Sequence, residues 1–355
     1  MTNARENQKR EAKKRDFSFY KAAKELIADF QERSQKILLS RFGLSSGTDH
    51  TLESIGRTYG VTRERIRQIV HAGIDSVKKK QRHPLLLQAE EKILRALEQK
   101  NGIMNEQDLF VVLGGDKGEE QKAVSFFVTV LGSVEKINYK GEVSCAVATR
   151  NFNLAQWRQI KGNLKQILEK RKDVCTMEEL HALAQRAELK VTQAQLQNYL
   201  AVSEEIRQNS FGKWGIASWQ EITPKGMREK VYLILKEQKN PLHFRDIAKR
   251  IEQYGLAKVG RRAHPQTVHN ELIKDPRFVL IGRGTYALSE WGYKDGTVKD
   301  VLKDIFSEEE MPLSSEQIIA QVLKVRQVKR STVMINLHNF FQRVDKNRYT
   351  VKRVQ

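Results

Sequence analysis

Between residues 63 and 71 the sequence concentrates side chains that can form hydrogen bonds with the edges of base pairs. A spacing of i, i+1, i+4, i+5 and i+8 puts five of them on one helical face. They are Arg63, Glu64, Arg67, Gln68 and His71, with Arg65 in the same run. Arginine suits guanine, glutamine suits adenine, and glutamate accepts a hydrogen bond from cytosine. The pattern predicts a helix that reads the major groove of double-stranded DNA.

The other face of this predicted helix is apolar. Its residues follow at i, i+3, i+4, i+7 and i+11, which is the spacing of a stripe packed on a core: Ile66, Ile69, Val70, Gly73 and Val77. At its end, Lys78, Lys79, Lys80 and Arg82 are suited to neutralising phosphates. An ordinary solvated, charged helix is the alternative interpretation, but the agreement of both faces with the flanking signals favours a recognition helix.

Those flanking signals predict a helix-turn-helix. Thr51 can cap a first helix, with Glu53 in its first turn, and Thr62 can cap the second. Between the two helices, Gly60 supplies the tight turn. In such a motif the N-terminal part of the second helix meets the bases, and this is where Arg63 to Gln68 stand.

Residues 30–85 strongly resemble region 4 of the sigma-70 family of bacterial sigma factors. The resemblance is carried by Arg41–Leu44, Asp49–Glu53, Ile55-Gly56, Val61–Ile69 and Arg82–Pro84. It implies that the helix reads a −35-like promoter element through Arg63, Glu64, Arg67 and Gln68. It also implies docking on the β flap of RNA polymerase.

The sequence departs from that family in two ways. Val70-His71 stands where the family usually has Glu-Ala, which changes the contacts expected further along the groove. A complete sigma factor also has an upstream domain whose aromatic residues melt the −10 element. About thirty residues precede the module, without a tryptophan-rich helix, so we expect that the protein does not initiate transcription alone.

The remaining sequence repeats one layout: three helices followed by two short strands. Gly or Asn turns lie within alternating apolar residues in four places, which are hairpin signals: 134–149, 206–219, 278–291 and 341–351. Three helices and a hairpin are typical of a winged helix. The fold class predicted is mainly α, with tandem helix-turn-helix and α+β winged-helix domains. We expect a flexible basic arm at 1–16, the sigma region 4-like helix-turn-helix at 17–85, and winged helices at 86–150, 151–221, 222–295 and 296–355.

The fourth of these domains has a second resemblance. Residues 222–295 are similar to the HARE-type helix-turn-helix, through Pro241-Leu242, Ile247-Ala248, Asp275, Arg277-Phe278, Gly282–Leu288 and Trp291-Gly292. Members of that family include the N-terminal domain of the RNA polymerase delta subunit, chromatin-associated proteins and restriction-system proteins. The resemblance implies DNA binding or association with polymerase.

Polar residues in this domain are candidates for DNA contacts. A basic loop precedes a helix expected to start near His264-Pro265, and a second hairpin turn follows it. The candidates are Arg261, Arg262, Gln266, Thr267, His269, Asn270 and, at the wing tip, Arg283, with Lys258 in the same loop. The alternative is that these are ordinary surface residues. Tyr286 and Trp291 are expected to anchor the core.

Composition agrees with a polyanionic partner. The 355 residues hold 63 Lys and Arg against 43 Asp and Glu, a net charge of +20, which favours nucleic acid first and an anionic membrane surface second. No apolar run approaches the roughly 20 residues that span a bilayer, and no apolar segment follows the basic N-terminus. We therefore expect no membrane partner and a cytoplasmic protein acting at the bacterial nucleoid.

The sequence contains no recognisable catalytic or metal-binding pattern. Cys145 and Cys175 are not in a CxxC, and His264 and His269 have no evident third ligand. Phosphate-binding glycine loops are absent. We predict no enzymatic activity, no cofactor, no metal and no small-molecule substrate.

Three functions are compatible with these features. The leading hypothesis is a DNA-binding transcription regulator or sigma-like accessory factor acting with RNA polymerase. The alternatives are a nucleoid-structuring protein with little sequence specificity and a DNA-targeting subunit of a restriction or repair system.

Overall fold

The computed structural model describes residues 17–45, 47–257, 260, 262–293, 296–308 and 311–351. The chain divides into two compact units, residues 1–207 and 208–355. The predicted basic arm at 1–16 lies outside the described residues. No helix in the described part is both long and apolar enough to cross a membrane.

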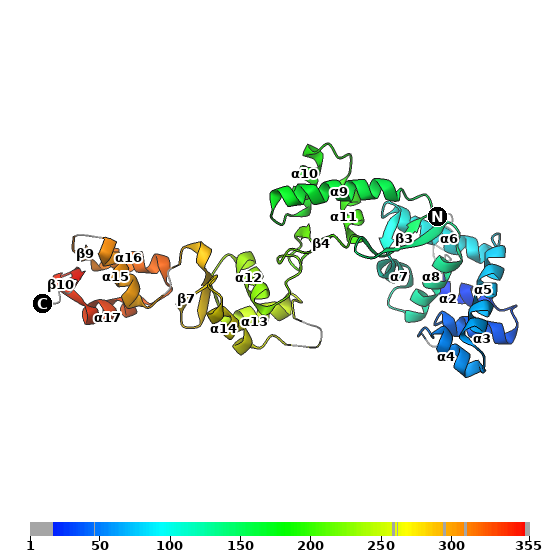
Figure 1. Ribbon diagram of the computed structural model, residues 1–355, viewed down its shortest axis with the longest axis horizontal. Helices are drawn as coiled ribbons and strands as arrows, with labels where there is room; N and C mark the ends of the chain where they lie inside the picture. The colour runs from blue at the N-terminus through cyan, green and yellow to red at the C-terminus, as the bar shows by residue number, and fades with distance from the viewer. Residues whose placement is uncertain are drawn as a thin grey trace, which may run out of the picture. The chain divides into compact units, whose positions relative to one another are not determined.

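Unit 1 begins with four helices that contain the predicted helix-turn-helix (Figure 1): α2 (Phe19–Leu26), α3 (Glu32–Arg41), α4 (Leu52–Tyr59) and α5 (Arg63–Lys79). Hydroxyl groups cap three of them. Ser18, Thr51 and Thr62 each accept a hydrogen bond from the backbone N–H three residues on, at the starts of α2, α4 and α5. The caps predicted for α4 and α5 are confirmed, so local side-chain chemistry sets where these helices begin.

A winged helix follows: α6 (Pro84–Glu98), β1 (Ile103–Asn105), α7 (Glu106–Gly114), α8 (Gly118–Val130), β2 (Val134–Tyr139) and β3 (Val143–Thr149). The predicted hairpin is confirmed, with Gly141 at positive φ in its turn. The short strand β1 was not predicted. It pairs antiparallel with β3 and completes a sheet of order β1-β3-β2.

Three more helices complete most of unit 1: α9 (Leu154–Arg171), α10 (Met177–Arg186) and α11 (Gln193–Ala201). The boundary between the units falls within β4 (Ile206–Gln208), inside the segment 206–219 that the sequence predicts to be a hairpin. The second strand of that segment, β5 (Trp214–Ile216), belongs to unit 2.

Unit 2 contains two winged helices of the same topology. The first has α12 (Met227–Gln238), β6 (Leu242–His243), α13 (Phe244–Gln253), α14 (Pro265–Lys274), β7 (Phe278–Gly282), β8 (Thr285–Leu288) and the short 3-10 helix η1 (Ser289–Trp291). The second has α15 (Val298–Glu308), β9 (Leu313–Ser314), α16 (Ser315–Val325), α17 (Arg330–Phe340), β10 (Phe341–Asp345) and β11 (Arg348–Val351). Their sheets have orders β6-β8-β7 and β10-β11-β9. The predicted fold class, mainly helical with tandem winged helices, is confirmed.

The cores are distributed differently in the two units. Each winged helix of unit 2 has a core of its own, and Tyr286 is buried in the first as predicted, with Trp291 partly buried against it. In unit 1, one continuous core extends from Phe19 to Val147. The sequence predicts a separate core for each module, and here the structure differs, because α8 packs against α2 and α5.

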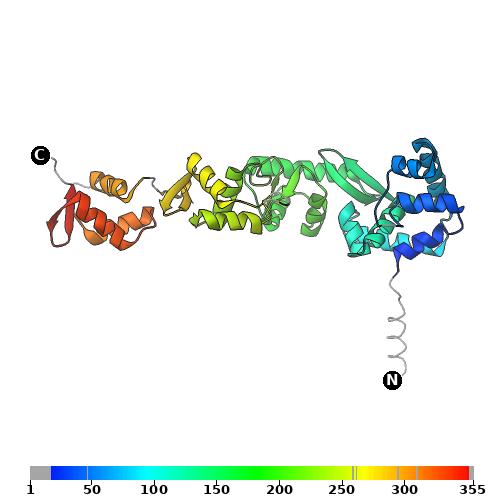
Figure 2. The ribbon, with the colours of Figure 1, turned by 90° about the horizontal axis from the view of Figure 1, so that it is seen from below.

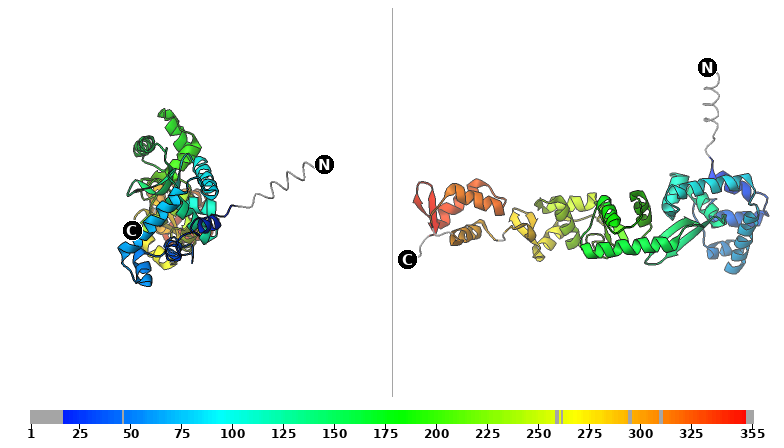
Figure 3. Two further views of the ribbon diagram at one scale, coloured as in Figure 1. Left: turned by 90° about the vertical axis from the view of Figure 1, so that its right-hand side faces the viewer. Right: turned by 90° about the horizontal axis from the view of Figure 1, so that it is seen from above.

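The wings of two winged helices are tied to neighbouring segments of the chain. In unit 1, the turn between β2 and β3 reaches α9 and the segment after α11 (Figure 3), where Val143 bridges Ser203 and the Ser144 N–H donates to the Val202 carbonyl at 3.0 Å. In unit 2, the Gln327 N–H donates to the Ile281 carbonyl on β7 at 3.1 Å. These hairpins serve as connectors within the units.

Candidate DNA interface

The turn between α4 and α5 has the close approach that a helix-turn-helix requires. Gly60 ends α4 with a φ of 64°, in the left-handed region that favours glycine. A Cβ on Gly56 would lie 2.7 Å from the Val61 carbonyl oxygen, so a larger residue would push the two helices apart. These glycines fix how α5 stands on α4.

The two faces of α5 are separated as the sequence predicts. Ile66, Val70, Gly73 and Val77 are buried in the core of unit 1. Ile69 is only partly buried, at the edge of a groove lined also by Phe30. The polar residues on the other side are all exposed: Arg63, Glu64, Arg65, Arg67, Gln68 and His71. The structure thus brings six of the predicted contact residues together on one open surface, which we call the α5 face.

Polar contacts hold several side chains of the α5 face in place. Arg67 forms a bidentate ion pair with Glu64, with Nε–Oε2 and Nη2–Oε1 distances of 2.8 Å. Arg65 donates to the Gln68 side-chain oxygen at 3.2 Å, and His71 Nδ1 lies 3.0 Å from Asp75. The hydrogen bond from Arg67 lowers the pKa of Glu64, which keeps this carboxylate ionised. The pair presents one donor fork and one acceptor at the helix N-terminus.

The lysines at the end of α5 are not equivalent. Lys78 and Lys79 are exposed, as phosphate ligands must be. Lys80 instead donates to both carboxylate oxygens of Asp29, at 2.8 and 2.9 Å, and to the Leu26 carbonyl. Its ammonium also lies 5.3 Å from the centre of the Phe30 ring. Lys80 therefore has a structural role, because these contacts fix the C-terminus of α5 to the end of α2.

In unit 2, α14 occupies the corresponding place in its winged helix. Val268 and Leu272 are buried in the core, and the opposite side of the helix exposes Gln266, Thr267 and Asn270. Gln266 donates to the Asn270 side chain at 3.1 Å. The structure therefore brings these three predicted residues together on one polar surface.

The other residues predicted in this domain lie in different environments. Arg262 and Arg283 are exposed, in the loop before α14 and at the wing tip. His269 is partly buried, and its ring packs against Phe244 and Tyr286, with centroid distances of 4.7 and 5.8 Å. His269 thus contributes to packing under the wing. Arg261 and Lys258 lie outside the described residues.

Among the described residues, no group of three or more His, Cys, Asp or Glu side chains is arranged to hold a metal ion. Cys145 is exposed and Cys175 is buried. Burial raises the pKa of the Cys175 thiol to about 11, so this side chain stays protonated and behaves as a small apolar group.

Sequence reasoning missed the contacts that hold the interface from behind. Lys80 and Asp29 are 51 positions apart, and the Ser18 hydroxyl donates to Glu120 across 102 positions. No local pattern in the sequence marks such pairs. The nearest signal is the excess of aromatic residues in 126–127, which indicates a core without identifying its partner.

Comparison with known families identifies both helix-turn-helix segments. Residues 26–79 match the family model for sigma-70, region 4. Residues 227–291 match the HARE-HTH family, whose description names a restriction endonuclease HTH domain. Both are DNA-binding helix-turn-helix domains, and the protein is therefore of the DNA-binding helix-turn-helix class.

Similar proteins give the first segment a closer relationship. The RNA polymerase sigma factor RpoD of Neisseria gonorrhoeae is 45% identical over 67 residues, which is 19% of this chain and 10% of that protein. The RNA polymerase sigma factor SigA of Listeria monocytogenes is 42% identical over 73 residues, 19% of this chain and 18% of that protein. The chain thus spans less than a fifth of the length of either relative. Its N-terminal helix-turn-helix is related to sigma factors.

Proposed function

We propose that this protein is a transcription regulator, or sigma-like accessory factor, that reads a −35-like promoter element through the α5 face and associates with bacterial RNA polymerase. The observation that carries the proposal is the α5 face itself. Six polar side chains are exposed at the N-terminal half of a capped helix whose opposite side is buried. The relationship of this segment to sigma factors supports promoter DNA as the target.

The chemistry of the α5 face suits base recognition. Arg63 and Arg67 can each donate two hydrogen bonds to guanine, and Gln68 can pair with adenine. Glu64 disfavours phosphate, because its carboxylate is ionised, and accepts from cytosine. Lys78 and Lys79 add attraction to the backbone. In this mechanism the lysines position the protein and the α5 face selects the sequence.

Polymerase association rests on the family relationship. The relatives are named as RNA polymerase sigma factors, and we infer that region 4 of this chain contacts the β flap. The α14 surface, with Arg262, Gln266, Thr267, Asn270 and Arg283, is inferred to add a second DNA contact. Neither role requires a cofactor, a metal or catalysis, and the site of action is the bacterial chromosome.

A nucleoid-structuring function is the second candidate, because a net charge of +20 and repeated winged helices favour binding of DNA of any sequence. Genome-wide occupancy mapping with the tagged full-length protein separates the two. The proposal predicts peaks at promoters that coincide with RNA polymerase, and recovery of polymerase subunits with the tagged protein. Diffuse coverage without polymerase would overturn it in favour of the nucleoid function.

A further inference from the structure

Charge is strongly segregated in the C-terminal winged helix. Residues 297–321, which include α15 and the first part of α16, hold six acidic and two basic side chains. Residues 322–351, which include α17, β10 and β11, hold seven basic and one acidic. The basic residues therefore gather on the third helix and the wing, the two elements that a winged helix can present to a nucleic acid.

The third helix, α17, has an open face. Val333 and Leu337 are buried in the domain core. The opposite side exposes Ser331, His338 and Ile335, the last with 58% of its surface accessible. Lys329 and Arg330 are exposed at the N-terminus of the helix, where a recognition helix meets DNA. The helix thus combines two cations at its start with polar and aliphatic side chains further along.

The hairpin that follows extends the cationic surface. Figure 2 shows β10 and β11, in red, beside α17 at the C-terminal end of the described chain. Arg343, Lys346 and Arg348 are exposed on this hairpin, and Asp345 is its one acidic residue. Their charges lie on the element that reaches a neighbouring groove or phosphate strand when the helix enters a major groove.

Two other cations of this domain are engaged elsewhere. The buried Arg326 guanidinium donates to the Leu280 carbonyl on β7 at 3.0 Å. Lys299 lies 4.1 Å from the centre of the Phe340 ring. We therefore define the α17 face as Lys329, Arg330, Ser331, Ile335, His338, Arg343, Lys346 and Arg348, and leave Arg326 and Lys299 out of it.

We propose that the α17 face binds double-stranded DNA, mainly through its phosphates. Charge complementarity argues for a polyanion, and the protruding helix argues for a duplex, since a helix fits the major groove of B-DNA. Before Phe340, the exposed side chains of α17 include no Phe, Tyr or Trp, the residues on which single-stranded interfaces stack bases. Ile335 is suited to apolar contact with a thymine methyl group.

This inference goes beyond the proposed function, because it assigns DNA contact to a domain outside both matched segments, 26–79 and 227–291. It gives unit 2 an anchoring role that depends little on sequence. The α17 face can bind DNA whether or not the α5 face reads a promoter, so the two proposals are tested separately.

The experiment compares two double variants of the full-length chain on a duplex of scrambled sequence, over a range of salt concentrations. Lys329→Ala/Lys346→Ala removes two charges from the α17 face. Lys225→Ala/Lys303→Ala removes two exposed charges of unit 2 outside that face and is the matched control. Circular dichroism and thermal melting verify that both variants fold like the parent.

The first variant is expected to lose about tenfold or more in affinity near 0.1 M salt, and its slope of log affinity against log salt should become shallower by about 1.8, or 0.9 for each lost phosphate contact. The control should keep the parent's slope. Identical slopes for both variants would overturn the proposal, as would a loss found only on RNA of the same sequence. Failure of the α5 face to discriminate sequence would appear separately, with −35-like and scrambled duplexes bound equally by the parent.

Discussion

The third helices of the two N-terminal modules, α5 and α8, hold the same place in their folds and present opposite surfaces. On α5 the side away from the core is polar and exposed. On α8 the helix is buried by Ala123, Val124, Phe126, Phe127, Val128 and Val130. The aromatic rings of α8 reach into the neighbouring module, where Phe126 packs edge-on against Phe42 and Phe127 against Phe19.

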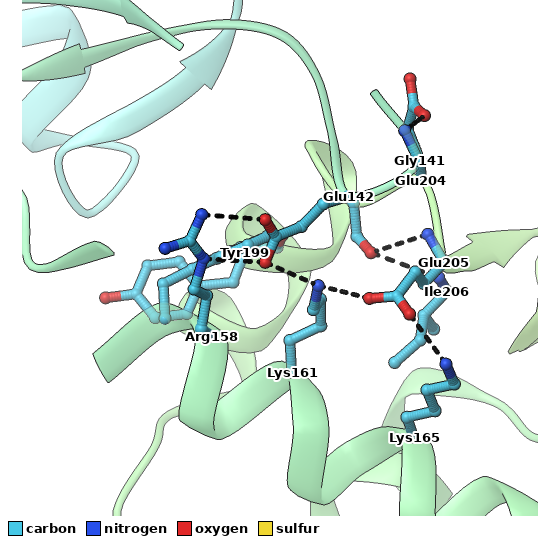
Figure 4. A network of polar contacts seen from close by, with 11 residues as sticks. Gly141, Glu142, Arg158, Lys161, Lys165, Tyr199, Glu204, Glu205 and Ile206 are labelled. Carbon is cyan, nitrogen blue, oxygen red and sulfur yellow. Dashed lines mark hydrogen bonds and ion pairs between the residues drawn. The ribbon is translucent and has the colours of Figure 1, made fainter. Parts of the chain in front are cut away.

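The wing that accompanies α8 is also engaged within unit 1 (Figure 4). Glu142, in the turn after β2, forms ion pairs with Arg158 at 2.9 Å and with Lys161 at 3.2 Å. Lys161 also pairs with Glu205, which Lys165 contacts at 2.8 Å. The first winged helix has thus used both its third helix and its wing to hold its neighbours. Helix-turn-helix topology therefore does not itself make a DNA reader, since the exposed face decides.

The largest effect is expected from truncating α8 in the shared core. Phe127 is fully buried, and Phe127→Ala should lower the free energy of unfolding of unit 1 by about 3–5 kcal/mol, because the cavity left behind is only partly filled. Urea unfolding followed by circular dichroism measures this. Since one core joins the two modules, both should lose stability together.

Val112→Ala, on the exposed surface of α7, is the control for Phe127→Ala. It should change stability by no more than about 0.5 kcal/mol. If Phe127→Ala unfolds the winged helix and leaves α2 to α5 as stable as before, the two modules are independent and the comparison between α5 and α8 loses its structural basis.

The next effect tests the buried side of α5. Ile66 is fully buried, and Ile66→Ala should cost about 2–5 kcal/mol of stability. Ile69→Ala should cost less, about 1 kcal/mol, because this side chain already contacts solvent. Thermal melting of both variants decides the order. A larger loss for Ile69→Ala would mean that α5 is rotated relative to the arrangement described above.

A smaller effect is expected at the wing anchor. Lys161→Met keeps the apolar stem and removes the ammonium that joins Glu142 and Glu205. The cost should be about 2 kcal/mol at pH 7, less than for fully buried pairs, because both carboxylates reach solvent. Urea unfolding of the variant and the parent measures the difference. No loss of stability would mean that the network contributes nothing to holding the wing.

The same network predicts a pH dependence. Hydrogen bonds from Arg158 and Lys161 lower the pKa of Glu142 below its ordinary value of 4.5. Burial raises the pKa of Glu205, but the hydrogen bonds from Lys161 and Lys165 outweigh it and lower that pKa as well. The stabilisation is therefore complete above the ordinary value and is lost as pH falls through the lowered values. Lys161→Met should weaken this acid dependence, and an unchanged pH profile would contradict the assignment.

The features that can be predicted from the sequence are those set by local patterns. Caps at Thr51 and Thr62, the turn at Gly60 and the polar stripe from Arg63 to His71 all depend on residues within a few positions of one another. The same holds for the four predicted hairpin segments. Alternation over several residues is a periodic signal, and it is readable without any knowledge of tertiary contacts.

The features that the sequence does not predict depend on distant contacts or on very short elements. β6 and β9 have two residues each, too few for alternation to be visible. The burial of α8 against α2 and the pairing of Lys80 with Asp29 join segments far apart in the chain. A lysine at the end of a basic helix resembles its exposed neighbours in sequence, and only the fold distinguishes Lys80 from Lys78 and Lys79.

The central claim, that the α5 face reads bases, is tested most directly by a competition titration of Arg67→Ala and Lys79→Ala against −35-like and scrambled duplexes. Arg67→Ala should cost about 1–3 kcal/mol on the −35-like duplex and little on the scrambled one, because a base contact is lost while phosphate contacts remain. Lys79→Ala should weaken binding modestly and equally on both, with a shallower salt slope. Equal losses for Arg67→Ala on the two duplexes would contradict base reading by α5 and leave only backbone binding.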